Sequence, residues 1–103
     1  MATLYPKKRI EIVIEQIRAN DAIEMLENAG AKGYTILRKV SGKDNRGIRV
    51  GGPLPYIFGN VMIIAIVSDH MATKILNNAH LLFEDVAGIV AVSDMQALRS
   101  EHF

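Results

Sequence analysis

Cysteine and tryptophan are absent from this chain of 103 residues, and its aromatic side chains are limited to three Tyr and three Phe. Without cysteine there can be no disulfide, no thiolate metal site and no cysteine nucleophile, a composition compatible with a reducing cytoplasm. The longest uninterrupted apolar run, residues 61–67, is far shorter than the roughly 20 residues of a membrane-spanning helix. The N-terminal segment lacks the hydrophobic region of a secretory signal, so we expect a cytoplasmic protein.

A large excess of charge of one sign is also missing, because the formal net charge at pH 7 is +1. No global field therefore favours nucleic acid or a membrane surface as a partner. Half of the residues are hydrophobic, which is ample for the core of one small domain. A domain of this length buries a limited share of its surface and often gains stability by oligomerisation.

Hydropathy periodicity predicts four strands and two helices. Ile10, Ile12 and Ile14 alternate with other residues, as in a strand with one buried face. After residue 19 the apolar residues recur three and four apart, as in an amphipathic helix, and Gly30 provides a C-terminal stop. The predicted elements are, in chain order, a strand over 8–16, a helix over 19–29, a strand over 33–40, a long loop over 41–59, a strand over 61–67, a helix over 70–83 capped by Ser68 and Asp69, a strand over 88–93 and a short helical turn over 95–98.

This order predicts an α+β fold of the ferredoxin-like βαββαβ class, with one domain over residues 1–103 and a long loop between the second and third strands. Both helices of such a fold cover the same face of the sheet. Residues 61–67 are apolar without alternation, which is typical of a strand buried on both faces. We therefore expect a partner subunit to cover the face that the helices leave bare.

The long loop and its entrance carry the clearest chemical signal. Five cations fall within twelve residues, and Asp44 is the one acidic residue among them. The five are Arg38, Lys39, Lys43, Arg46 and Arg49. Glycines beside them allow backbone amides to approach an anion closely, and arginine offers several donors to phosphate or carboxylate. The pattern favours an oxyanion-binding site, with a solvated basic turn as the alternative.

Patterns for catalysis or metal binding do not stand out in the sequence. It has no nucleophile elbow, no Walker lysine motif and no suggestive pair of carboxylates. His70 and His80 are ten residues apart on a predicted helix, which places them on different faces and argues against a shared metal. We therefore predict a ligand-binding protein with no catalytic residues and no metal site, rather than an enzyme.

Three segments resemble the PII signalling family, and the likeness covers nearly the whole chain. Residues 30–35 (GAKGYT) resemble the entry to the T-loop, residues 41–49 (SGKDNRGIR) its basic base, and residues 84–89 (EDVAGI) a shortened B-loop. The likeness is greatest to the bicarbonate-linked, carboxysome-associated PII-like group. It implies a homotrimer that binds an adenine nucleotide, ADP or AMP, together with bicarbonate in clefts between subunits. It also implies that the T-loop, about residues 41–59, changes order with the ligand and controls a partner such as a membrane transporter for bicarbonate.

The resemblance also assigns ligand-binding residues. Thr35 matches a position near the adenine. The T-loop base near the phosphates corresponds to Gly42, Lys43, Arg46 and Arg49, the B-loop backbone to Val86, Ala87 and Gly88, and the wider set adds Lys39, Ser41 and Asn45. PII proteins carry a Gly-Asp-Gly-Lys element in the B-loop, whereas this chain has Val-Ala-Gly-Ile at 86–89. The lack of that lysine implies a preference for ADP or AMP over ATP.

Other interpretations of the same fold stay open. A small trimeric metal-binding protein resembling CutA would contain metal after purification, and an oligomeric ferredoxin-like enzyme would turn over a substrate. An amino-acid-binding domain resembling the ACT family would not need the long basic loop. A nucleic-acid binder of this topology would need exposed aromatic residues on its central strands, and residues 10–16 and 61–67 contain none.

Overall fold

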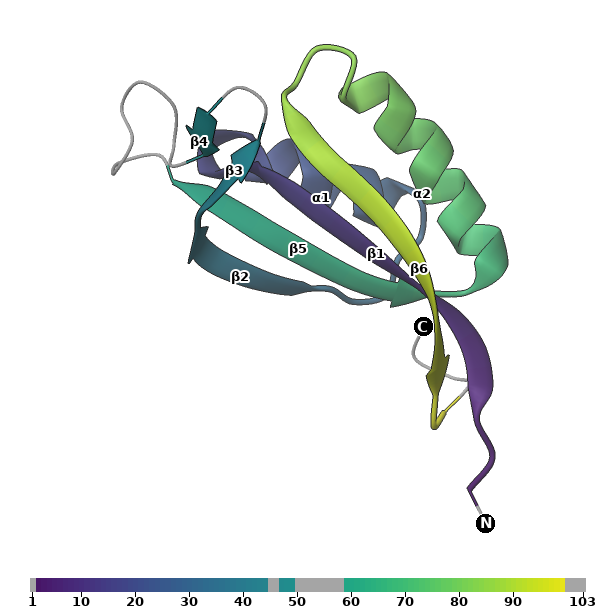
Figure 1. The fold of residues 1–103 in the computed structure, drawn as a ribbon. Helices are drawn as coiled ribbons and strands as arrows, with labels where there is room; N and C mark the ends of the chain where they lie inside the picture. Colours follow the sequence, from purple (N-terminus) through teal and green to yellow (C-terminus); the bar gives the residue numbers. More distant parts are fainter. Residues whose placement is uncertain (1, 45–46, 50–58, 100–103) are drawn as a thin grey trace.

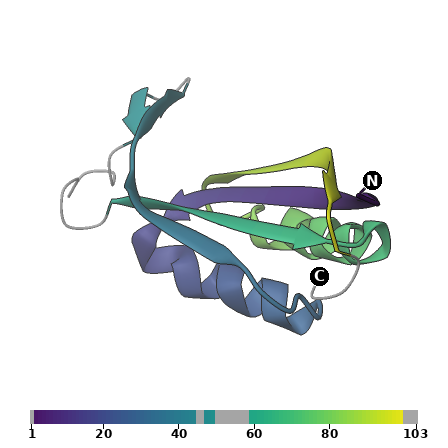
Figure 2. The same ribbon diagram turned by 90° about the horizontal axis from the view of Figure 1, so that it is seen from below.

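The computed structural model describes residues 2–44, 47–49 and 59–99, and for 42–44 and 47–49 it describes the backbone. A four-stranded antiparallel sheet in the order β2-β5-β1-β6 forms the body of the protein, with α1 and α2 on one of its faces (Figures 1 and 2). The elements are β1 (Tyr5–Glu15), η1 (Gln16–Arg18), α1 (Ala19–Asn28), β2 (Thr35–Val40), β3 (Gly42–Asp44), β4 (Gly47–Arg49), β5 (Asn60–Val67), α2 (Asp69–Leu82) and β6 (Gly88–Ala97). This arrangement confirms the predicted ferredoxin-like fold.

The hydrophobic core lies between the two helices and the central strands of the sheet. Ile10, Ile12 and Ile14 of β1 are fully buried, and Ile12 pairs with Ile63 of β5, which is also fully buried. Burial of each of these aliphatic side chains contributes about 1.5–3 kcal/mol. The three alternating isoleucines of β1 therefore form the face of the strand that is buried under the helices, and the sequence predicted that β1 has one buried face.

Both helices have the ends that the sequence indicates. The Oγ of Ser68 accepts a hydrogen bond of 3.2 Å from the backbone N–H of Met71, which caps the N-terminus of α2. Gly30 follows α1 with φ +97°, a left-handed conformation that glycine adopts without steric cost. Leu26 of α1 and Ile75 of α2 are fully buried against the sheet.

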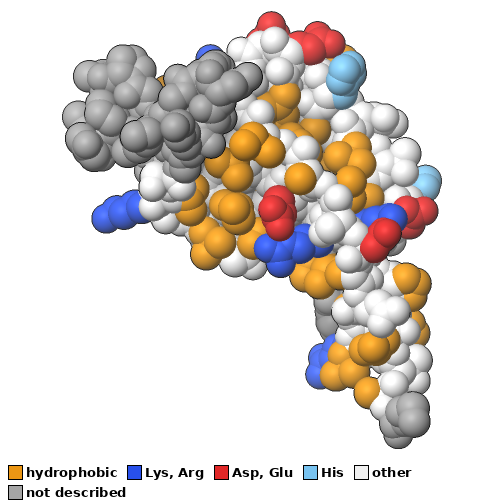
Figure 3. All heavy atoms as spheres, viewed as in Figure 1, with side chains coloured by type: hydrophobic (Ala, Val, Ile, Leu, Met, Phe, Trp, Pro, Cys, Tyr) orange, Lys and Arg blue, Asp and Glu red, His pale blue; other side chains and the backbone are white. Residues whose placement is uncertain are grey.

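The opposite face of the sheet has no cover within the described part of the chain. Its apolar residues, which we call the open face, follow from the strand register and are Val13, Leu37, Met62, Ile64, Ile66, Ile89 and Ala91. Leu37 and Ile89 are 45% and 47% exposed, and every second residue of β5 is half-buried. Figure 3 views the sheet from this side and shows hydrophobic side chains gathered over it.

The predicted helical turn over 95–98 is wrong, because β6 continues as a strand to Ala97. Its end pairs with the start of β1, from Tyr5 opposite Ala97 to Lys8 opposite Asp94. The Nζ of Lys8 forms an ion pair with Asp94 and lies 3.7 Å from Oδ1 of Asp69 at the start of α2. Backbone pairing with β1 and this ion pair hold the segment extended, and the two strands project beyond the rest of the sheet (Figure 1).

The segment over 41–59 was predicted to be a loop without regular structure, and this prediction is wrong for part of it. β3 and β4 pair as an antiparallel hairpin, with Gly42 opposite Arg49 and Asp44 opposite Gly47. Strands of three residues are too short to produce a detectable hydropathy period. Among the described residues, no helix has the length and apolar character needed to cross a membrane.

Candidate functional site

Two of the segments assigned to ligand binding lie at the same end of the sheet. Val40 at the end of β2 pairs with Asn60, and Asn60 also pairs with Glu15 at the end of β1. The neighbouring residue of β1, Ile14, pairs with Gly88 at the start of β6. The exit from β2 and the turn between α2 and β6 therefore lie at the same sheet end, on its two outer strands, and Figure 1 shows the β3–β4 hairpin at this end as well.

The exit from β2 contains an unusual backbone conformation at Lys39. Its φ is +58°, the one positive value among the described residues other than glycine, and the register with β5 shifts between Arg38 and Val40. A side chain in this left-handed region costs roughly 1–2 kcal/mol. The bulge redirects the chain out of the sheet toward β3, and both Lys39 and Ser41 are exposed.

The turn between α2 and β6 is packed closely against the sheet. Val86, Ala87 and Gly88 are half-buried, and Val86 packs against the core. A Cβ atom at Gly88 would lie 2.8 Å from the carbonyl oxygen of Val13, closer than real Cβ contacts come. The turn can therefore follow its observed path only because residue 88 has no side chain.

Thr35 does not join the other assigned residues within one chain. It lies at the start of β2, opposite Ile64 in the middle of β5. Five residues of extended strand separate Thr35 from Val40, about 16 Å at roughly 3.3 Å per residue. Its partner Ile64 belongs to the open face, so Thr35 is positioned to face whatever covers that surface.

Two of the assigned residues, Asn45 and Arg46, lie outside the described residues. The backbone of Gly42, Lys43 and Arg49 belongs to the hairpin of β3 and β4. Pairing of Gly42 with Arg49 returns the chain to its starting point, so the assigned residues on β3 and β4 stay close to the exit from β2. The structure thus places these backbone positions at the same sheet end as the turn that contains Val86, Ala87 and Gly88, with β5 and β1 between the two.

Sequence reasoning missed Asn60 at this sheet end. Asn60 is fully buried, the one polar residue in the buried set of the described chain. Gly59 beside it accepts a hydrogen bond of 2.8 Å from the backbone N–H of Gln16, which joins the start of β5 to the end of β1. A polar residue directly before the apolar run 61–67 was the signal that could have identified it.

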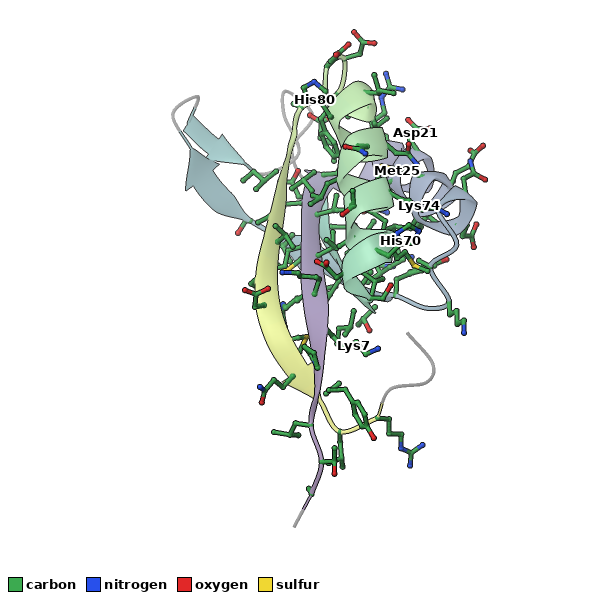
Figure 4. All side chains as sticks on the ribbon, turned by 90° about the vertical axis from the view of Figure 1, so that its right-hand side faces the viewer. Lys7, Asp21, Met25, His70, Lys74 and His80 are labelled. Atoms are coloured by element: carbon green, nitrogen blue, oxygen red, sulfur yellow. The ribbon has the colours of Figure 1, made fainter. Side chains whose placement is uncertain are left out.

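The two helix histidines do not form a site together. Figure 4 labels them at opposite ends of α2, and ten residues of helix span about 15 Å. His80 Nε2 lies 4.0 Å from Oε1 of Glu84. His80 and Glu84 border a cavity of about 370 Å³ that also contacts Phe83 and Gly88. Within the described segments, no group of three or more His, Cys, Asp or Glu side chains is arranged to hold a metal ion.

Comparisons with known proteins agree with this geometry. The family model of nitrogen regulatory protein P-II matches residues 7–102. CPII from Thiomonas intermedia K12, a nitrogen regulatory PII-like protein whose structure holds ADP, AMP and bicarbonate, is 34% identical, with a TM-score of 0.86 and coverage of 96% of this chain and 94% of that one. A CPII structure with ADP and bicarbonate is 35% identical, with a TM-score of 0.84 and coverage of 96% and 95%.

A PII-like signalling protein from Thermus thermophilus is 28% identical over 97% of both chains, with a TM-score of 0.75. A comparison with curated proteins finds no match. The family match extends over nearly the whole chain, and the CPII structures match it above 30% identity. The chain therefore belongs to the nitrogen regulatory protein P-II family.

Proposed function

We propose that this protein is a PII-like regulatory sensor that binds ADP or AMP, together with bicarbonate, in clefts between the subunits of a homotrimer. The observation that carries the proposal is the likeness to CPII, whose structures hold ADP, AMP and bicarbonate, over 96% of this chain. In this reading the exit from β2 is the T-loop base and the turn before β6 is the B-loop. Both lie at the same sheet end, as a shared ligand requires.

The nucleotide phosphates would lie against the T-loop base. Lys39 and Ser41 are exposed there, and Lys43, Arg46 and Arg49 add cationic charge in the sequence that follows. The B-loop contributes backbone from Val86 to Gly88 but no cation, because Ile89 follows directly. The additional terminal phosphate of ATP would lack the cationic partner that the B-loop lysine supplies in PII proteins, so we assign the site to ADP or AMP rather than ATP.

A site between subunits explains why Thr35 stands apart from the other assigned residues. It faces the side of the sheet to which Ile64 belongs, and the described part of one chain does not cover that side. A trimer that packs these faces together would carry Thr35 of one subunit to the T-loop base of the next. The adenine end of the ligand would then contact one subunit and the phosphates the other.

Ligand binding would act through residues 41–59. Ordering a segment of this length loses much conformational entropy, and an anion that bridges its cations can offset that loss. Bicarbonate is a small planar anion that suits a guanidinium, and its effect on nucleotide affinity must be matched by an equal effect of nucleotide on bicarbonate. The ordered T-loop would then control a partner in the cytoplasm, such as a bicarbonate transporter.

Complementation between two binding-deficient variants tests the shared site. We expect Thr35→Ala and Arg46→Ala each to lose ADP binding, with Lys74→Ala on the outer surface of α2 as the control. In trimers refolded from an equal mixture, about a quarter of the sites combine intact residues from both subunits. Recovery of about that fraction of ADP sites is the expected result. No recovery from the mixture, while the wild type refolded in the same way binds ADP, would contradict a site formed between subunits.

The rival functions are separable by direct measurement. A CutA-like protein would copurify with metal, which elemental analysis detects, and an enzyme would consume one of the candidate ligands. We predict neither: the bound nucleotide should be recovered chemically unchanged after prolonged incubation. The P-II family match favours a regulatory protein over both rivals.

A further inference from the structure

An ion pair lies among the apolar residues of the open face. The Nε of Arg9 donates to Oε1 of Glu11 at 2.8 Å, and both side chains are 36% exposed. Strand register places Arg9 between Ile66 and Ser93, and Glu11 between Ile64 and Ala91. Figure 3 shows an acidic and a basic side chain side by side among the hydrophobic ones on this face.

The pair is not needed to stabilise the single chain. A partly exposed ion pair between neighbours on one strand contributes little in water. The contact of the Arg9 guanidinium with Glu11 is made through Nε, and because 36% of the side chain is exposed, Arg9 can still donate to a second acceptor. Oε2 of Glu11 can accept in the same way.

The charges of this surface fit a second copy of the same chain. One cation and one anion lie side by side among mostly apolar residues of this face, so the pair is neutral as a whole and can complement the same pair on another copy. A strongly acidic or basic partner would leave one of the two charges facing a like charge. In a cyclic arrangement of copies, each copy can place its Arg9 against Glu11 of the next copy.

We propose that Arg9 and Glu11 set the register and copy number of the homotypic interface formed by the open face, with Arg9 of each copy contacting Glu11 of the next. This inference rests on the proposed trimer and adds the residues that specify it. Aliphatic surfaces alone allow several arrangements, because hydrophobic contact is not directional. Burial of Arg9 or Glu11 in the interface without an opposite charge facing it on the other copy is strongly unfavourable. Arrangements of the copies that leave either charge unmatched in this way are therefore excluded.

Charge reversal of each member tests the proposal. Arg9→Glu and Glu11→Arg each place like charges together wherever copies meet, so we expect the dissociation constant of the assembly to rise by roughly a hundredfold or more. Molar mass from light scattering, measured over a dilution series, reports this change. Arg18→Glu is the control, because Arg18 also pairs with a carboxylate, that of Asp21 in the first turn of α1 at 3.4 Å, and its side chain is 54% exposed away from the open face. This control should keep the mass of the wild type.

The exchanged variant Arg9→Glu/Glu11→Arg distinguishes loss of the interface from misfolding of the chain. It restores one charge of each sign, so it should regain the assembly that the single variants lose, while circular dichroism confirms that all four proteins are folded. Replacement by apolar residues, Arg9→Met/Glu11→Leu, should still associate but give a mixture of masses. A single wild-type mass for this variant would overturn the role in register, and so would single reversals that leave the mass unchanged.

The same samples separate this inference from the proposed function. ADP binding by the wild type together with unchanged mass in the single reversals would overturn the interface role alone. Failure of the wild type to bind ADP, with the predicted pattern of masses intact, would overturn the ligand assignment and support the interface. A monomeric wild type at high concentration would overturn the interface role and the shared site together.

Discussion

The ring of Phe83 fills the space beside Gly88, so that a Cβ atom on residue 88 would lie 2.9 Å from its Cδ1. The carbonyl oxygen of Val13 closes the other side at 2.8 Å. One of these neighbours is a side chain that can rotate and the other is the backbone of a central strand. The end of the turn between α2 and β6, which we assign to the B-loop, is therefore closely packed, in addition to the backbone hydrogen bonds that Glu84 and Asp85 donate within the turn.

Substitution of Gly88 by alanine should lower the free energy of unfolding by about 1–3 kcal/mol, the usual effect of an extra carbon in a well-packed site. Urea denaturation measures it. Gly33→Ala is the control, because a Cβ there meets no atom within 4 Å. Phe83→Leu in the alanine background should recover part of the loss but not all, since the carbonyl of Val13 remains. Equal stability of the two alanine variants would contradict the close packing.

Lys8 links three elements and should make stability depend on pH at the alkaline end. The hydrogen bond to Asp94, with the added attraction of Asp94 and Asp69, raises the pKa of Lys8 above its ordinary value of 10.5. A raised pKa in the folded state means that the contribution is complete below pH 10.5 and disappears as the pH rises through the folded value. Lys8→Met should therefore be less stable than the wild type at pH 8, and the difference should shrink above pH 10.5.

Thermal unfolding of Lys8→Met and the wild type across this range measures the effect. Lys74→Met on the exposed side of α2 serves as the control for the loss of one surface charge. A stability difference for Lys8→Met that stays constant from pH 8 to pH 11.5 would show that the Lys8 stem, not its charge, makes the contribution.

Ile89 offers a direct test of nucleotide preference. It follows the B-loop, is 47% exposed and stands where the resemblance to PII proteins would place a lysine. Ile89→Lys supplies the missing cation and should improve the affinity for ATP relative to ADP by roughly tenfold. Ile89→Gln, similar in length but uncharged, is the control in the same titrations. An unchanged ratio of the two affinities would mean that the terminal phosphate does not reach this residue.

Much of the fold was predictable because the local signals agree with the tertiary structure. Alternation at Ile10, Ile12 and Ile14, the cap at Ser68 and the stop at Gly30 each specify one element, and all of them are confirmed. The end of β6 was missed because residues 94–97 (DMQA) alternate over four positions only, which is too short to distinguish a strand from a helical turn. Their conformation depends on pairing with Tyr5–Lys8, which a local window cannot detect.

For the candidate site, the sequence predicts the chemistry of a ligand, which stays a prediction, but not the geometry of the backbone. The cluster of cations after β2 indicated an anion ligand, but the left-handed Lys39 and the register shift beside it have no sequence signal, because lysine rarely adopts that conformation. The position of Asn60 directly before an apolar strand was a signal, but its complete burial is visible only in the folded chain. The distance between Thr35 and the rest of the assigned residues follows from strand register, and only the folded chain displays it.

The most direct test of the central claim is isothermal titration of the purified protein with ADP, in buffers with and without bicarbonate. We predict saturable binding of about one ADP per subunit, an affinity that changes when bicarbonate is present, and a matching change in bicarbonate affinity when ADP is present. Titrations with AMP and ATP in the same buffers rank the nucleotides. Absence of binding by all three nucleotides, with and without bicarbonate, would contradict the assignment of this protein as an adenine-nucleotide sensor.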